Sequence, residues 1–248
     1  MNAIFKREFK SYFSTPIGYI ILAALYFFLG FYFSVIYSGG YPDVPMIIVQ
    51  MSPIIVFALP ILTMRLMSED RRQKVDQALL TAPVKLTAIV IGKFLAAFAV
   101  FSMAFIPTII FEIIVATYVS VNIMSYIYAL LGILLLGAAL IAIGMFISSL
   151  TESPVISAIL TFVINIFVLY MSNFASLISV PTGENFISKI YARIVEGIVL
   201  CLEKMAFISA FENFGTNIFS VADIVYFLSI IAVFLFLCVR SLEKRRWS

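Results

Sequence analysis

The chain contains no histidine, and only 12% of its 248 residues are charged. Without histidine it lacks the commonest general base and metal ligand of proteins. Soluble domains usually carry about 25% charged residues, so the low charge content argues against a water-soluble fold. The only two cysteines, Cys201 and Cys238, fall in segments that we expect on opposite sides of a membrane, so a disulfide between them is not expected.

Motifs for nucleotide binding and catalysis are also missing. Gly92-Lys93 resembles part of a phosphate-binding loop, but Thr87 stands where that loop needs glycine and Phe94 where it needs serine or threonine. The sequence shows no metal cluster, no paired catalytic carboxylates and no nucleophile with a base. We therefore expect no catalytic residue, no metal and no cofactor bound by this chain. The formal net charge of +3 is too small to indicate a nucleic-acid partner.

Apolar residues are abundant: they make up 63% of the chain, and the mean hydropathy is +1.13. A helix needs about 20 mostly apolar residues to cross a bilayer. The sequence therefore predicts an all-α polytopic membrane protein with a single transmembrane domain over residues 1–248 and lipid as its solvent. The six predicted spans are Ile17–Tyr37, Met46–Met64, Ala88–Val115, Ile123–Ser149, Val155–Ala175 and Val221–Val239.

Basic residues indicate the orientation, because cytoplasmic segments of membrane proteins are enriched in Lys and Arg. Thirteen of them lie in the N-terminal tail, between the second and third spans, and at the C-terminus. Three lie on the other side, at Lys189, Arg193 and Lys204. We expect both termini in the cytoplasm and the chain in the inner (cytoplasmic) membrane, which agrees with an even number of spans.

Residues 1–16 place aromatic side chains at helical spacing, with basic residues elsewhere on the helix. This pattern predicts an interfacial amphipathic helix. The helix is either a simple membrane anchor or an elbow that links the first span to a cytoplasmic partner. The aromatic residues are Phe5, Phe9, Tyr12 and Phe13.

The loop of residues 65–87 predicts a short, charged cytoplasmic helix that is connected to two spans. Ser68 is a suitable helix cap, and Pro83 ends the segment. The segment is either a solvated hairpin or a coupling surface for a partner. The residues that we assign to coupling are Glu69, Asp70, Arg71, Arg72, Val75 and Leu79.

The outer loop of residues 176–220 is too long to be a simple turn. Apolar residues recur at helical spacing between Glu184 and Phe207, which predicts a helix that lies on the outer surface or re-enters it. This segment is either a lid over a pathway or a plain interfacial helix.

Two polar residues inside the spans are candidates for the pathway or for packing. Glu112 either takes part in function or lies at the outer interface at little cost. Asn165 lies deeper in its span, where hydrogen bonding between helices is the expected role.

Several sequence marks together resemble the ABC-2 type permeases, the membrane subunits of bacterial ABC exporters, over nearly the whole chain. They are closest to the gliding-motility-associated branch, which is similar to permeases of nitrous-oxide reductase maturation. The branch name does not imply motility for this chain, because similar permeases widely carry it. The marks are Phe5-Lys6-Arg7-Glu8-Phe9 with Thr15-Pro16, Leu62-Thr63-Met64-Arg65, Ser68-Glu69-Asp70-Arg71-Arg72, Leu79-Leu80-Thr81-Ala82-Pro83, Gly92-Lys93-Phe94 and Gly144-Met145-Phe146-Ile147-Ser148-Ser149-Leu150-Thr151-Glu152.

The resemblance implies a homodimer or heterodimer of six-span permeases with two ABC ATPase subunits, which use the ATP. It also implies that the loop of residues 65–87 is a coupling helix inserted into the ATPase. The alternative is a self-contained secondary transporter or channel subunit. Such proteins usually show ionisable or broken-helix features near the membrane midplane and an internal repeat, and we find no convincing repeat here.

Overall fold

The computed structural model describes residues 2–40, 43–72, 85–176, 206–216 and 220–246, together with residues 193, 195, 197 and 199. In this part of the chain the regular structure is entirely helical. The helices are α1 (Asn2–Ser14), α2 (Pro16–Ser38), α3 (Val44–Gln50), α4 (Ser52–Thr63), α5 (Ser68–Arg72), α7 (Leu86–Met103), α8 (Ile106–Ala116), α9 (Ile123–Leu150), α10 (Pro154–Leu169), α11 (Met171–Ser176), α13 (Phe207–Gly215) and α14 (Val221–Arg246).

Five helical stretches of the described residues are long and apolar enough to cross a membrane. They contain α2, α4, α7 with α8, α9 and α14. The fifth predicted span is shorter than expected, because α10 has 16 residues and the helix breaks at Tyr170 before α11. The chain therefore has the architecture of a multi-pass, all-helical membrane protein.

Prolines divide two of the predicted spans. Pro53 lies in the first turn of α4 and Pro107 in the first turn of α8, so α3 is separated from α4 and α7 from α8. A proline lacks the backbone N–H and clashes with the carbonyl four residues earlier, so a helix breaks before it. For Pro107 that carbonyl belongs to Met103, and it accepts a hydrogen bond of 3.0 Å from the Tyr26 hydroxyl of α2.

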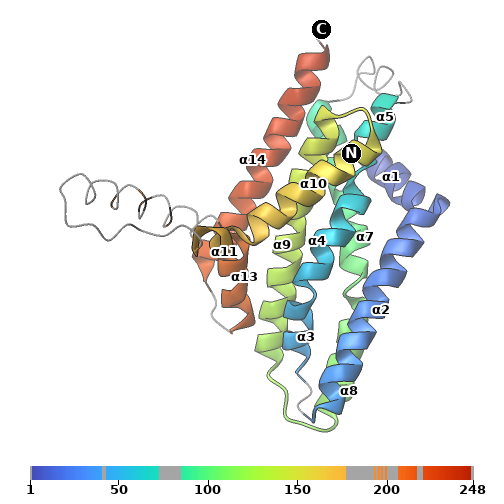
Figure 1. Cartoon of the computed structure of the whole chain (residues 1–248). Helices are drawn as coiled ribbons and strands as arrows, with labels where there is room; N and C mark the ends of the chain where they lie inside the picture. The colour runs from blue at the N-terminus through green and yellow to red at the C-terminus, as the bar shows by residue number, and fades with distance from the viewer. Residues whose placement is uncertain are drawn as a thin grey trace.

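The central helix of the bundle is α9, and it packs against α3, α4, α7, α10, α13 and α14 (Figure 1). Its most apolar stretch is 72% buried within the chain, against 11% for α14 and 22% for α2. Small residues in α9 allow neighbouring helices to approach it closely. A side chain at Gly137 would collide with the Phe101 ring of α7. The apolar side chains that α2, α10 and α14 leave exposed suit contact with lipid.

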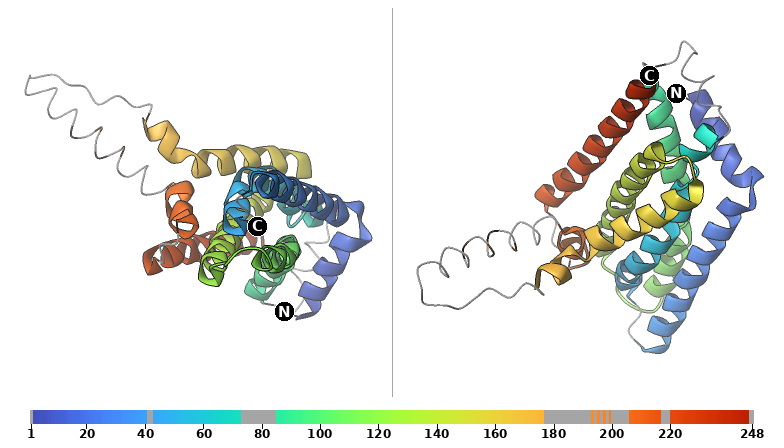
Figure 2. Two further views of the ribbon diagram at one scale, coloured as in Figure 1. Left: turned by 90° about the horizontal axis from the view of Figure 1, so that it is seen from below. Right: turned by 45° about the horizontal axis from the view of Figure 1, so that its top comes forward.

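Both chain termini lie at one end of the bundle, together with α1 and α5; we call this the terminal end (Figure 1, Figure 2). The opposite end, called the loop end, carries the end of α8 and the start of α9. The predicted N-terminal helix is confirmed as α1, which runs at an angle to α2 from the junction at Thr15-Pro16.

The helix predicted between Glu184 and Phe207 lies outside the described residues, apart from residues 193, 195, 197 and 199, which are helical. The same predicted loop contains α13, whose Phe211 and Phe214 are buried. The Phe214 ring sits over Gly132 of α9, where no side chain would fit.

Candidate functional site

A buried lysine joins three elements at the terminal end. Lys93 of α7 is 1% exposed, and its Nζ atom lies 2.7 Å from Oδ2 of Asp70 in α5 and 3.1 Å from Oε1 of Glu8 in α1. It also donates a 2.7 Å hydrogen bond to the Leu66 carbonyl. An ammonium group has three donors, and all three are used here. Because each bond goes to a different segment, Lys93 fixes α1, residue 66 and α5 relative to α7.

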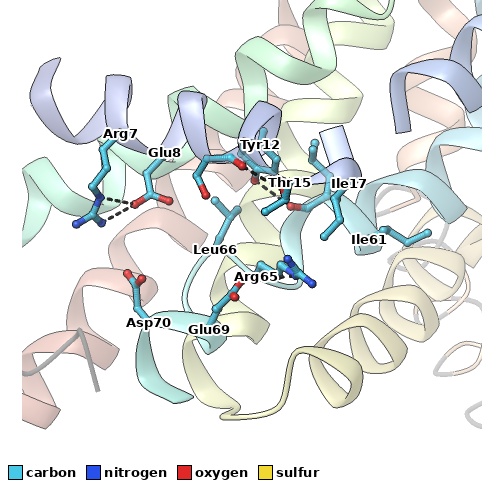
Figure 3. Close-up of a pocket in the computed structure, with 12 residues that line it drawn as sticks. Arg7, Glu8, Tyr12, Thr15, Ile17, Ile61, Arg65, Leu66, Glu69 and Asp70 are labelled. Atoms are coloured by element: carbon cyan, nitrogen blue, oxygen red, sulfur yellow. Dashed lines mark hydrogen bonds and ion pairs between the residues drawn. The ribbon is translucent and has the colours of Figure 1, made fainter. Parts of the chain in front are cut away.

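Arg7 is a second cation beside Lys93, Glu8 and Asp70, and it balances the charge of these three residues. The guanidinium of Arg7 lies 2.5 Å from Oε1 of Glu8, and this hydrogen bond raises the pKa of Arg7. We call Arg7, Glu8, Asp70 and Lys93 the ion cluster. The charges of its two cations and two carboxylates sum to zero. This balance stabilises a buried site, because an unpaired buried charge is costly. Figure 3 shows Arg7 and Glu8 of α1 on one side and Asp70 of α5 on the other.

The start of α5 is held by the C-terminal part of α9. The Ser148 hydroxyl accepts hydrogen bonds from the backbone N–H of Met67 (3.1 Å) and of Ser68 (3.0 Å), and it donates to the Met64 carbonyl (3.1 Å). These are groups that a helix end leaves without partners of its own. The Ser68 hydroxyl, predicted as the cap of this helix, donates to the Met64 carbonyl. Ser148 performs the capping role from another helix.

Arg71 of α5 extends the same connection to the junction between α9 and α10. Its Nη1 donates to the Leu150 carbonyl (3.1 Å), and its Nη2 lies 2.6 Å from Oε1 of Glu152. Glu69 lies 3.6 Å from Arg65 in a looser pair. Arg72 is exposed at the end of the described segment. Of the four charged residues predicted to face a partner, Asp70 and Arg71 therefore make close ion pairs within the chain.

Tyr12 fastens α1 to the end of α4. The side chain is buried, and its hydroxyl donates a 2.9 Å hydrogen bond to the Leu62 carbonyl. Burial raises the pKa of the Tyr12 hydroxyl, so it stays protonated and keeps this bond. The rings of Phe5, Phe9 and Phe13 contact one another in sequence along α1: Phe5 and Phe9 are stacked at a centroid distance of 5.7 Å, and Phe9 and Phe13 are tilted at 5.2 Å.

A cavity of about 300 Å³ separates α1 from the α4–α5 connection (Figure 3). Its walls combine charged side chains of both segments with the apolar Ile17 and Ile61. Three members of the ion cluster, Arg7, Glu8 and Asp70, line this cavity.

Several members of this site were missed in the sequence. In the sequence, Lys93 contributes only to the count of basic residues that indicates the orientation. A lysine eight residues into an apolar helix also predicts a buried, oppositely charged partner. Glu8, Ser148 and Glu152 stand in the marked motifs without an assigned role. The predicted coupling residues Val75 and Leu79 lie outside the described residues.

The two pathway candidates lie apart from the ion cluster. Glu112 of α8 is buried and borders a cavity near the loop end. Asn165 belongs to a buried polar face of α10 together with Ser157 and Thr161, which packs against α4 and α9. Among the described residues neither amide atom of Asn165 has a hydrogen-bond partner, and the two hydroxyls of this face have none there either, so this part of the chain does not form the hydrogen bond to another helix that was predicted for Asn165.

The family model described as ABC-2 type transporter matches residues 1–192, which cover α1 through α11 and the ion cluster. A search of curated proteins gives no match. Because the match spans more than half of the chain, this multi-pass membrane protein belongs to the ABC-2 type transporter family.

Proposed function

We propose that the chain is the permease subunit of an ATP-driven exporter and that α5 receives motion from a separate ABC ATPase subunit. Family membership supports the permease role. The observation that carries the coupling role is Lys93, which is bonded at once to α1, to residue 66 and to α5. A push on α5 must therefore move α7 and α1 as well.

In this proposal the charged residues of α5 have two different tasks. Asp70 and Arg71 connect α5 to α7 and to the α9–α10 junction, so they transmit force within the permease. Arg72 is exposed. We assign contact with the ATPase to Arg72 and Glu69 and, from the sequence pattern alone, to Val75 and Leu79. This division refines the sequence-based hypothesis, in which all six residues face the partner.

The proposal includes a defined topology and assembly. Six spans are reached when α10 and α11 together form the short fifth crossing, and the basic residues of the terminal end then face the cytoplasm of the inner membrane. The working unit is a dimer with a second copy or a related permease, and the ATPase subunits use the ATP. The resemblance of the sequence marks to the gliding-motility-associated branch supports assigning the assembly to that branch.

Topology is tested by labelling single cysteines in intact cells with an impermeant reagent, after Cys201 and Cys238 are replaced by serine. We expect Ser38→Cys to be labelled and Arg72→Cys to be labelled only after the cells are opened. The reverse pattern would refute the orientation.

Coupling is tested with the chain co-expressed with a candidate ABC ATPase subunit that co-purifies with it. Arg72→Glu should reduce co-purification, because it reverses a charge on the docking surface. The triple variant Glu8→Gln/Asp70→Asn/Lys93→Met removes the ion pairs without leaving a buried charge. It should keep association but lose transport-coupled ATP turnover. Full turnover in the triple variant would refute transmission through the ion cluster, and a self-contained transporter would function with no ATPase at all.

A further inference from the structure

A second polar cavity, of about 240 Å³, lies near the loop end of the bundle, far from the ion cluster. It is enclosed by the start of α3, the end of α8 and the turn that leads into α9. Its polar walls consist of oxygen-bearing side chains, from Asp43, Glu112, Ser120, Asn122 and Ser125.

No cationic side chain from the described part of the chain lines this cavity. The sequence has no Lys or Arg from residue 11 to 64 or from residue 94 to 188, so the two carboxylates have none nearby along the chain. Among the described residues, neither Asp43 nor Glu112 has an ion pair. The cavity therefore concentrates negative charge, in contrast to the balanced ion cluster.

One carboxylate oxygen of Glu112 has no hydrogen-bond partner among the described residues. The residue is 9% exposed, and its Oε2 atom is buried with no hydrogen bond. The hydroxyl of Thr108, one turn before Glu112, is engaged elsewhere, because it donates to the Phe105 carbonyl (2.6 Å) and lies 3.0 Å from the Tyr126 hydroxyl. A buried carboxylate without a donor is costly, so a group that supplies positive charge would stabilise it.

We propose that this cavity binds a divalent hard cation, with Ca²⁺ preferred over Mg²⁺. Two carboxylates match the charge of the ion, and the amide and hydroxyl oxygens are the donors that such ions take. Asn122 is already fixed as the cap of α9, because its Oδ1 accepts from the Met124 N–H at 3.1 Å. The donors lie on two helices and an irregular turn, an arrangement that suits the flexible coordination of Ca²⁺ better than the strict octahedron of Mg²⁺.

A bound ion would join α3 to α8, the two helices on the loop-end side of the proline breaks. The proposal is independent of the coupling role, since it involves no residue of the ion cluster. It assigns the loop end a stabilising site that acts without ATP.

The test uses the full chain purified in a neutral detergent and treated with a chelator. Thermal unfolding is followed with Ca²⁺, Mg²⁺ or K⁺ at equal ionic strength. Calcium at about ten times its Kd should raise the unfolding midpoint by about 3–5 °C, with a smaller shift for Mg²⁺ and none for K⁺. Asp43→Asn and Glu112→Gln should abolish the calcium shift. Glu212→Gln, an exposed carboxylate outside the cavity, should retain it.

Direct binding is measured by equilibrium dialysis with radioactive calcium. We expect one ion per wild-type chain and at least a tenfold loss of affinity in Asp43→Asn. Asp43 is exposed, so this variant tests the site even if Glu112→Gln fails to fold. Absence of a shift in the wild type, or an equal shift in the wild type and Asp43→Asn, would overturn the proposal.

Discussion

The ion cluster and the polar face of α10 differ in whether their buried polar groups have hydrogen-bond partners. At the ion cluster, Lys93 uses all three donors, and the neighbouring Ser148 makes three hydrogen bonds. On α10, four polar atoms of Ser157, Thr161 and Asn165 are buried without a partner. Directional bonds fix one geometry, whereas a face held by shape alone can shift without breaking hydrogen bonds. The comparison implies a rigid unit at the terminal end and a movable contact at α10.

The largest effect should come from Lys93→Ala. The substitution leaves the Glu8 and Asp70 carboxylates without their shared cation, and breaking a buried pair costs about 3–5 kcal/mol. We expect little monodisperse protein in size-exclusion chromatography and a clearly lower unfolding midpoint. Lys85→Ala, at an exposed position just before α7, is the matched control and should behave as wild type. If both variants behave alike, the ion cluster does not hold this end together.

The next effect concerns Ser148→Ala. The backbone N–H groups of Met67 and Ser68 lose their acceptor, and each unmet group costs about 1–3 kcal/mol. The unfolding midpoint should fall, by less than in Lys93→Ala. Ser102→Ala is the control, since that hydroxyl only donates within α7 to the Phe98 carbonyl. Equal stability of these two serine variants would show that α9 does not anchor α5.

A smaller effect on stability is expected for Arg71→Glu, because its partner Glu152 is largely exposed and such pairs contribute about 1 kcal/mol or less. The larger consequence should be a loss of transport-coupled ATP turnover. The exchange Arg71→Glu/Glu152→Arg should restore part of that turnover, since the pair is rebuilt with reversed polarity. The same Glu152→Arg change should not rescue Arg72→Glu. Rescue of both would refute a specific link between Arg71 and Glu152.

The smallest effect belongs to α10. Asn165→Leu replaces an amide that has no partner by an apolar group of similar volume, so stability should be unchanged or slightly raised. Thermal unfolding of the purified chain measures this directly. A loss comparable to that of Ser148→Ala would mean that Asn165 is engaged and that the two regions do not differ as described.

Much of the fold follows from the apolar pattern alone. The predicted span Ile17–Tyr37 matches α2 within one residue at each end, and Ile123–Ser149 matches α9 equally well. The broken spans were predicted as continuous, although Pro53 and Pro107 carry the signal for a break. The fifth span, placed at Val155–Ala175, was overestimated because hydropathy does not register the helix break at Tyr170.

The site was less predictable than the fold. The charges of α5 were recognised, but their partners Lys93 and Glu152 are separated from them by up to about 80 positions, and only the packing of α5 against α7 and the end of α9 brings them together. Periodicity within one helix reports neighbours three or four residues apart and contains no information on such pairs. The missing partner of Asn165 is equally a property of the packed interface.

The central claim is that α1, α5 and α7 move as one body around Lys93. The direct measurement is the distance between spin labels at Lys10 and Arg72, both exposed, by pulsed electron paramagnetic resonance of the complex with its ATPase. We predict one narrow distribution that is the same without nucleotide and with trapped ATP. The triple variant Glu8→Gln/Asp70→Asn/Lys93→Met should broaden it. A distance that shifts with nucleotide in the wild type, or a triple variant as narrow as the wild type, would contradict the claim.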